Sequence, residues 1–283
     1  MCAADRLPSF VEDTELASIK LLACDMDLTL LADDKSQPEG MAERVAALTR
    51  AGVVFCPASG RPGPTLEEMF EANKHDIAFC PDNGGAVVYH DHVIYKACIE
   101  PALYHEVLDC AVDTGRGAPV LCALDHAYVL KRDRIYHDAL SIYYKDIRYV
   151  DDFNGLAVDS NKVTMYFPDM DSKAAFDEVY EPHFATRLSV TCSGGDWIDI
   201  MRLGVNKGEG IAHLCAHLGI DIADAAAVGD TYNDVQMLEA VGHSFLVANA
   251  EKHMYAHADY LVPSNNDRGV AVLIDAILAA KAR

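Results

Sequence analysis

Asp25 and Asp27 stand two residues apart at the end of a mostly apolar run, residues 19–24. A run of this kind predicts a strand buried on both faces of a parallel sheet. Side chains at i and i+2 of an extended segment face the same way, so the two carboxylates would repel each other. Open α/β folds bind ligands at this carboxyl edge. A bound cation or a reaction would explain the pair; the competing explanation is a polar loop that caps the next helix.

Three later segments carry polar residues in the same kind of setting. Ser59-Gly60-Arg61 follows the apolar run 53–56, and Gly229-Asp230-x-x-Asn233-Asp234 follows the run 225–228. Between them, Lys207 opens an amphipathic segment. The order along the chain is therefore acid pair, hydroxyl, lysine, acid pair, and these groups meet at one sheet edge if the runs are parallel strands.

These segments resemble the four motifs of the haloacid dehalogenase superfamily of phosphohydrolases. The first motif is matched by Asp25-x-Asp27-x-Thr29, the second by Ser59, the third by Lys207 and the fourth by Gly229-Asp230-x-x-x-Asp234. Further segments resemble its Cof-type branch of capped small-molecule phosphatases: Ser59-Gly60-Arg61, Asn83-Gly84-Gly85, Val205-Asn206-Lys207-Gly208, Gly229-Asp230-x-x-Asn233-Asp234 and Asn266-Asp267-Arg268-Gly269-Val270-Ala271.

Two positions depart from the usual pattern of that branch. Leu28 stands where many members have Gly, and Gly85 stands where Ala is more usual. Neither position supplies a catalytic side chain. We therefore expect altered local packing and an unchanged reaction.

Strand-like and helix-like segments alternate up to about residue 88, which predicts right-handed crossovers and a parallel sheet. Between about residues 97 and 196, alternating polar and apolar segments predict a half-exposed sheet instead. With the resemblance, the expected fold class is α/β: a doubly wound, Rossmann-like core with an inserted α+β cap. The expected boundaries are a tail over 1–18, a discontinuous core over 19–85 and 200–283, and a cap over 86–199.

The resemblance implies Mg²⁺-dependent hydrolysis of small phosphorylated metabolites, such as sugar phosphates or phosphorylated cofactors, through an aspartyl-phosphate. Asp25 would be the nucleophile and Asp27 the general acid and base, with Ser59 and Lys207 completing the catalytic set. Magnesium prefers oxygen ligands, so the expected metal residues are Asp25, Asp27 through its backbone carbonyl, Asp230 and Asp234. The expected substrate-binding residues are Ser59, Gly60, Arg61, Lys207 and Asn233.

Each assignment has a structural alternative. Ser59 is also a common turn residue, and Arg61 could pair with a surface acid. Lys207 could be solvated at a helix start, although the helix dipole disfavours a cation there. Asp230 and Asn233 could cap the next helix.

Two other functions remain open from the sequence. A phosphomutase or phosphotransferase would use the same aspartyl-phosphate and deliver it to a sugar hydroxyl. A non-catalytic regulator that binds phosphorylated metabolites is also compatible with the fold, since fold alone does not give function.

The composition of the chain excludes some classes of partner. The formal charge of −21 argues against nucleic acid, because affinity for a polyanion comes chiefly from Lys and Arg. The sequence contains no stretch of about 18 consecutive apolar residues, so it predicts no membrane span. Nine cysteines, several in apolar runs, indicate reduced thiols packed in the core, Cys24 among them. We expect a cytoplasmic protein whose partner is a small phosphorylated metabolite; the oligomeric state stays open.

Overall fold

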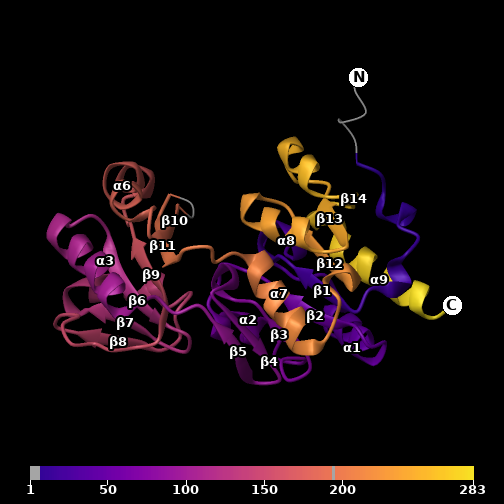
Figure 1. Ribbon diagram of the computed structural model, residues 1–283, viewed down its shortest axis with the longest axis horizontal. Coiled ribbons are helices and arrows are strands. Elements are labelled where there is room, and N and C mark those ends of the chain that lie inside the picture. Colours follow the sequence, from indigo (N-terminus) through magenta and orange to yellow (C-terminus); the bar gives the residue numbers. More distant parts are fainter. Residues whose placement is uncertain (1–6, 193–194) are drawn as a thin grey trace. The chain divides into compact units, whose positions relative to one another are not determined.

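The computed structural model describes residues 7–192 and 195–283. The chain divides into two compact units, whose elements are labelled in Figure 1. Unit 1 comprises the described residues of Met1–Gly60, Leu66–Tyr95 and Asn206–Arg283, and unit 2 those of Arg61–Thr65 and Lys96–Val205. Among the described residues, no helix has both the length and the apolar character needed to cross a membrane.

Unit 1 is built on a sheet of five strands in the order β14-β13-β12-β1-β2, with every neighbouring pair parallel. In chain order the strands are β1 (Leu21–Cys24), β2 (Val54–Pro57), β12 (Ala225–Gly229), β13 (His243–Val247) and β14 (Tyr260–Val262). All residues of β1, β12 and β13 are buried, as the apolar sequences of β1 and β12 predict; β13 also buries two polar residues, His243 and Ser244.

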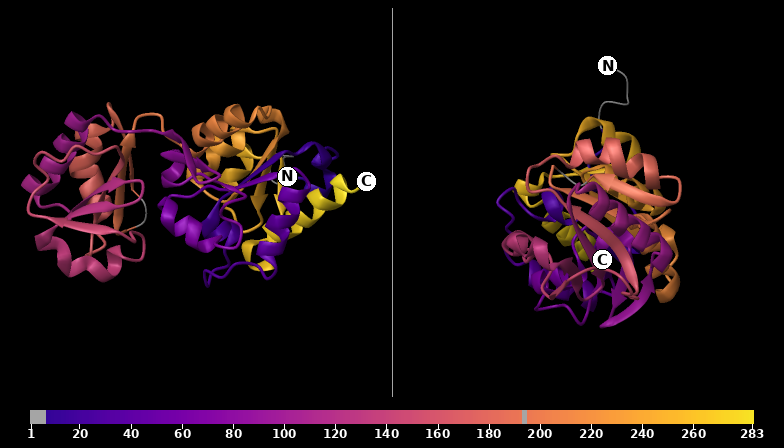
Figure 2. Two further views of the ribbon diagram at one scale, coloured as in Figure 1. Left: turned by 90° about the horizontal axis from the view of Figure 1, so that it is seen from below. Right: turned by 90° about the vertical axis from the view of Figure 1, so that its left-hand side faces the viewer.

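Helices connect and cover these strands. They are α1 (Met41–Arg50), α2 (Gly63–Met69, whose first residues belong to unit 2), α7 (Lys207–Leu218), α8 (Val235–Ala240) and α9 (Gly269–Lys281). Helix α7 packs against α8, and α1 packs against α9, which is yellow in Figure 2. Alternation of parallel strands with helices confirms the doubly wound α/β core.

A small antiparallel sheet continues unit 1. It contains β3 (Ala78–Phe79), β4 (Ala86–Tyr89) and β5 (His92–Lys96). A parallel bridge between Ala58 and Cys80 ties β3 to the end of β2. Strands β4 and β5 form a hairpin. Up to Tyr95 they belong to unit 1, whereas the expected range 86–199 assigned them to the insert. At the other end, residues 200–205 belong to unit 2.

Unit 2 is an α+β unit with a six-stranded sheet in the order β10-β11-β9-β6-β7-β8. Its strands are β6 (Ala118–Ala123), β7 (Ala127–Leu130), β8 (Ile147–Val150), β9 (Ser160–Tyr166), β10 (Leu188–Cys192) and β11 (Trp197–Arg202). Its helices are α3 (Pro101–Thr114), α4 (His137–Leu140), α5 (Ser172–Ala175) and α6 (Glu181–Phe184). The predicted α+β insert is present. Its sheet is antiparallel except for one parallel pair, β7 and β8, and its central strands β6 and β9 are almost entirely buried, not half-exposed.

The described part of the predicted N-terminal tail adds to unit 1. The Leu261 N–H donates to the Pro8 carbonyl at 2.8 Å, and Ser9 forms a parallel bridge to the same strand, β14. Phe10 is buried. Residues 1–6 of the tail lie outside the described residues.

Candidate active site

Three strand ends place the first polar groups of the site. Cys24 of β1 is level with Pro57 of β2 and Val228 of β12 in the parallel register. Asp25 therefore lies beside the ends of both neighbouring strands, and its N–H donates to the Val228 carbonyl at 3.0 Å. Asp25 thus lies at the carboxyl edge of the sheet, where the sequence predicts that the polar groups meet.

The chain turns sharply after Asp25. Residues Met26–Leu30 form a wide turn in which Leu28 has a φ of +61°, a left-handed conformation that L-residues with a Cβ disfavour. The Asn249 side chain donates to the Leu28 carbonyl at 2.8 Å, and the Leu30 N–H donates back to the Asp25 carbonyl at 3.3 Å. The turn gives Leu28 the conformation that Gly would adopt without strain.

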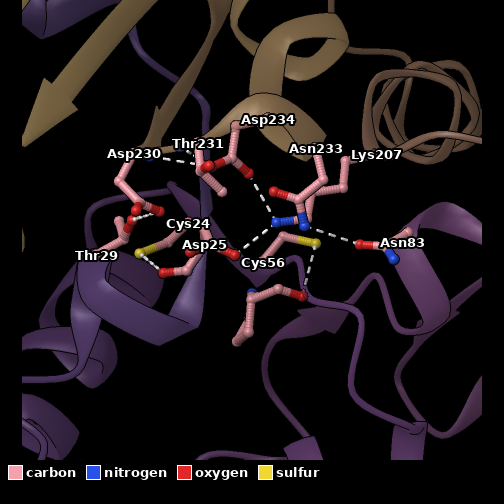
Figure 3. Close-up of polar contacts among 11 residues, drawn as sticks. Cys24, Asp25, Thr29, Cys56, Asn83, Lys207, Asp230, Thr231, Asn233 and Asp234 are labelled. Carbon is pink, nitrogen blue, oxygen red and sulfur yellow. Dashed lines mark hydrogen bonds and ion pairs between the residues drawn. The ribbon is translucent and has the colours of Figure 1, made fainter. Parts of the chain in front are cut away.

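Lys207 is fully buried and bridges two carboxylates (Figure 3). Its Nζ lies 2.5 Å from Asp25 Oδ1 and 2.7 Å from Asp234 Oδ1. Burial alone would lower the pKa of Lys207, but the carboxylates of Asp234 and Asp25 outweigh it and hold this pKa above its ordinary value. The lysine is thus a buried cation, not the solvated helix-start residue of the alternative.

Glycines let helix α7 approach its neighbours closely enough to bury Lys207. A Cβ on Gly208 would lie 2.4 Å from the Gln236 carbonyl oxygen, and one on Gly84 would lie 2.1 Å from the Asn206 carbonyl oxygen. Asn206 also caps the helix, since its Oδ1 accepts from the Glu209 N–H at 2.9 Å. Close packing and the cap together fix where the helix begins, and with it the position of Lys207.

The loop after β12 holds Asp234 at both oxygens. Its Oδ1 faces Lys207, and its Oδ2 accepts from the N–H groups of Asp230 at 3.0 Å and Thr231 at 3.2 Å. A Cβ at position 229 would lie 2.5 Å from the same Oδ2, so Gly229 leaves the space that the carboxylate occupies. The predicted caps, Asp230 and Asn233, are not the capping residues: Thr231 precedes the turn Tyr232–Asp234, and its N–H donates to the Asp234 carboxylate that also belongs to the charged site.

Asp25, Asp230 and Asp234 form the one group of three metal-type side chains found among residues 7–192 and 195–283. Their ligand atoms all lie within 4.8 Å of one another. Burial raises the pKa of Asp25 to about 8, with Asp234 and Asp230 adding to the shift and Lys207 opposing it. Burial and Asp234 raise the pKa of Asp230 to about 6, although Thr29 donates to its Oδ1 at 3.0 Å. Three carboxylates facing one ammonium group make a site that a cation would stabilise.

Asp27 lies apart from this carboxylate cluster. Its Oδ1 is 2.9 Å from Lys35 Nζ, and its side chain is 39% exposed. The expected metal contact of Asp27 is through its backbone carbonyl and stays a prediction, as does its acid–base role. An accessible carboxylate next to the buried one fits a group that exchanges protons with a substrate.

Ser59 and Gly60 lie on the loop that follows β2. Ser59 is buried, and its N–H donates to the Cys80 carbonyl at 3.0 Å. Asn233 lies on the loop of Asp230, and its Nδ2 donates to Asn83 Oδ1 at 3.1 Å. These expected substrate-binding residues all belong to unit 1, whereas Arg61 belongs to unit 2.

Three residues near the site were not assigned a role from the sequence. Thr29 and Asn83 lie within the motifs that resemble the family, so their polar side chains could have identified them from the sequence. Nothing in the sequence marks Lys35, which pairs with Asp27. Cys24, next to the nucleophile candidate, is fully buried, and burial raises the pKa of its thiol well above its ordinary value, so the predicted packing role is confirmed.

Comparison with known proteins identifies the class. A family model described as haloacid dehalogenase-like hydrolase matches residues 22–274. The 5-amino-6-(5-phospho-D-ribitylamino)uracil phosphatase YbjI of Escherichia coli K12 is 31% identical over 270 residues, which cover 94% of this chain and 98% of YbjI. The HMP-PP phosphatase of Escherichia coli O157:H7 (strain EC4115 / EHEC) is 26% identical over 269 residues, covering 89% of this chain and 93% of that protein.

Among solved structures, a candidate HAD/COF-like hydrolase from Plasmodium vivax matches with a TM-score of 0.80 and 24% identity, covering 93% of this chain and 96% of that one. The chain belongs to the haloacid dehalogenase-like hydrolase family. Within that family it is a phosphatase of the Cof type, with a Rossmann-like core and a cap.

Proposed function

We propose that this phosphatase hydrolyses small phosphorylated metabolites with the help of Mg²⁺, through an aspartyl-phosphate on Asp25. The observation that supports it most is the setting of Asp25: a buried carboxylate at a strand end, 2.5 Å from the Lys207 ammonium and within a cluster of three carboxylates. This arrangement supports the proposal, because a phosphoryl group on Asp25 would lie between the Lys207 ammonium and a bound cation.

In the first step, an Asp25 oxygen bonds to phosphorus as the bond to the leaving oxygen breaks. Asp27 donates a proton to that leaving oxygen. In the second step, Asp27 takes a proton from water, the water oxygen bonds to phosphorus, and the bond to Asp25 breaks to release phosphate. Lys207, Ser59 and nearby backbone N–H groups stabilise the negative charge on the phosphoryl oxygens.

Magnesium fits the donors that the site offers, since it prefers carboxylate and carbonyl oxygens. Asp25 and Asp230 are the proposed direct carboxylate ligands, with the Asp27 carbonyl. Asp234 already accepts at both oxygens, so its proposed role is to orient Lys207 and the Asp230 loop. When bound, the cation supplies charge that offsets the repulsion between the nucleophile and the phosphate.

The organic part of the substrate is proposed at the level of class. Sugar phosphates and phosphorylated cofactors are the expected substrates, and the compound named for YbjI, a phosphoribityl-aminouracil, belongs in the test set. Free cysteine thiols throughout the described residues fit a reducing compartment, so the cytoplasm is the proposed location.

Phosphate release tests the proposal. The wild type is assayed with a panel of sugar phosphates, nucleotides and phosphorylated cofactors, with Mg²⁺ and with chelator. Asp25→Asn is measured beside it, with Asp34→Asn as the control, because the exposed Asp34 carboxylate accepts from Ser36 two residues away. We expect metal-dependent release that Asp25→Asn abolishes and Asp34→Asn preserves. Transfer between hydroxyls without free phosphate would indicate a mutase instead, and binding without turnover would indicate a regulator.

A further inference from the structure

Residues Asp82–Gly84 form a turn with an unusual backbone. Asp82, Asn83 and Gly84 have φ values of +50°, +51° and +90°, three left-handed residues in succession. Gly84 meets no steric penalty there, but the two residues before it do. Left-handed non-glycine residues persist where the surrounding structure holds them, and they gather at functional sites.

The held conformation directs Asn83 at two loops of the candidate site. Its N–H donates to the Ser59 carbonyl at 2.8 Å. Its side chain lies over Gly60, because a Cβ there would be 3.1 Å from Asn83 Nδ2. Its Oδ1 accepts from Asn233 Nδ2 at 3.1 Å, and Figure 3 shows the two amides meeting beside Lys207.

Asn83 and Asn233 therefore connect two parts of the site that are far apart in the sequence. Asn83 is bonded to the loop that carries Ser59, and Asn233 stands one residue before Asp234, which Lys207 binds. We propose that the Asn83–Asn233 amide pair is a clamp that fixes the spacing between the Ser59–Gly60 loop and the Asp230–Asp234 loop, and so shapes the pocket for the phosphoryl group. Asn83 is a positioning residue that holds Asn233, itself an expected substrate-binding residue, and the effect of the pair on the reaction rests on the proposed function.

The choice of Asn at position 83 agrees with this role. Asn tolerates the left-handed region better than most side chains, and it still supplies an acceptor for Asn233. Gly would relax the backbone further but would remove the acceptor. Asn83→Gly thus separates the effect of backbone strain from the effect of the hydrogen bond, because it relieves the strain and removes the acceptor for Asn233.

A double-mutant cycle tests the clamp: Asn83→Gly, Asn233→Ala and the double variant. His90→Gly is the matched control, since His90 is an exposed left-handed residue (φ +48°) of the β4–β5 hairpin in the same unit. Each protein is measured for kcat/KM, for the affinity of inorganic phosphate in the presence of Mg²⁺ by calorimetry, and for thermal stability.

We expect each single variant to lower kcat/KM and phosphate affinity by about 10–100-fold, the range seen when groups that orient ligands are removed. The double variant should lose little more than either single one, because both break the same contact. His90→Gly should leave both quantities unchanged. Melting temperatures of Asn83→Gly at or above the wild type would show that unfolding is not the cause.

Losses that multiply in the double variant, or single losses under about threefold, would overturn the clamp. A wild type that binds phosphate but turns nothing over would count against the proposed hydrolysis, while the phosphate-affinity cycle would still decide the clamp. A wild type that neither binds phosphate nor turns over a substrate would overturn both.

Discussion

Replacing Lys207 by Met removes the only cation that contacts Asp25 and Asp234 among the described ion pairs. Asp25 is 6% exposed and Asp234 is fully buried, so neither carboxylate can gain much solvation in return. Breaking a buried ion pair by removing one partner costs about 3–5 kcal/mol of the free energy of unfolding. We expect Lys207→Met to cost about 3 kcal/mol or more at pH 8 without metal, and to abolish turnover.

The free energy of unfolding lost in Lys207→Met should depend on pH in a defined direction. The folded pKa of Asp25 is about 8, above its ordinary value of 3.8, so between those values the folded state holds more protons than the unfolded state. The free energy of unfolding therefore falls as pH rises through this window. Without Lys207 the Asp25 pKa rises further, so the difference between variant and wild type should shrink toward pH 6 and grow toward pH 9.

Urea unfolding provides the assay. Far-UV circular dichroism follows both units, whereas fluorescence of Trp197, the single tryptophan, follows unit 2. The control is Lys74→Met, which breaks a surface pair with Glu71 worth at most about 1 kcal/mol. Adding Asp25→Asn to Lys207→Met should recover about 1–2 kcal/mol, because one buried charge is gone. A loss below about 1 kcal/mol for Lys207→Met at pH 8, or one equal to the control's, would refute the reasoning.

Three further outcomes are expected. Leu28→Gly should raise the free energy of unfolding by about 0.5 kcal/mol, because left-handed strain at φ +61° is relieved and partly offset by chain entropy; a lower melting temperature would contradict this. Gly229→Ala should raise the Mg²⁺ concentration needed for half-maximal activity about 10–100-fold, because the new Cβ displaces Asp234; an unchanged value in a metal titration would count against it. Mg²⁺ should raise the melting temperature more at pH 8 than at pH 5.5, and its binding should release protons in calorimetry. The reason is that protons on Asp25 and Asp230 compete with the metal. Equal shifts of the melting temperature at both pH values would exclude that competition.

Local sequence predicted much of the core. Buried parallel strands were recognisable because both faces are apolar, as in β1 and β12. The insert was recognisable because its segments alternate. The hairpin β4–β5 belongs to unit 1 because β4 packs against α7, Val87 joins the core cluster, and the Ala58–Cys80 bridge ties β3 to β2; these contacts between distant segments are not visible in the local sequence.

The charged centre depended on contacts between distant residues. Lys207 follows a helix cap, where a lysine is normally solvated; it is buried because Asp25 and Asp234 approach from 182 and 27 residues away. The left-handed turn at Asn83 is likewise held by contacts with Ser59 and Asn233, which local preference does not encode. Motif resemblance located these residues, but their geometry required the fold.

The most direct test of the account is to identify the residue that carries the phosphoryl group. The wild type is quenched in acid during turnover with Mg²⁺ and a substrate found in the panel, the acyl phosphate is reduced with borohydride, and the peptide containing residue 25 is examined by mass spectrometry. The proposed mechanism predicts homoserine at position 25, absent when substrate is omitted. Steady turnover with Asp25 unmodified, or with the reduced residue at another carboxylate, would contradict it.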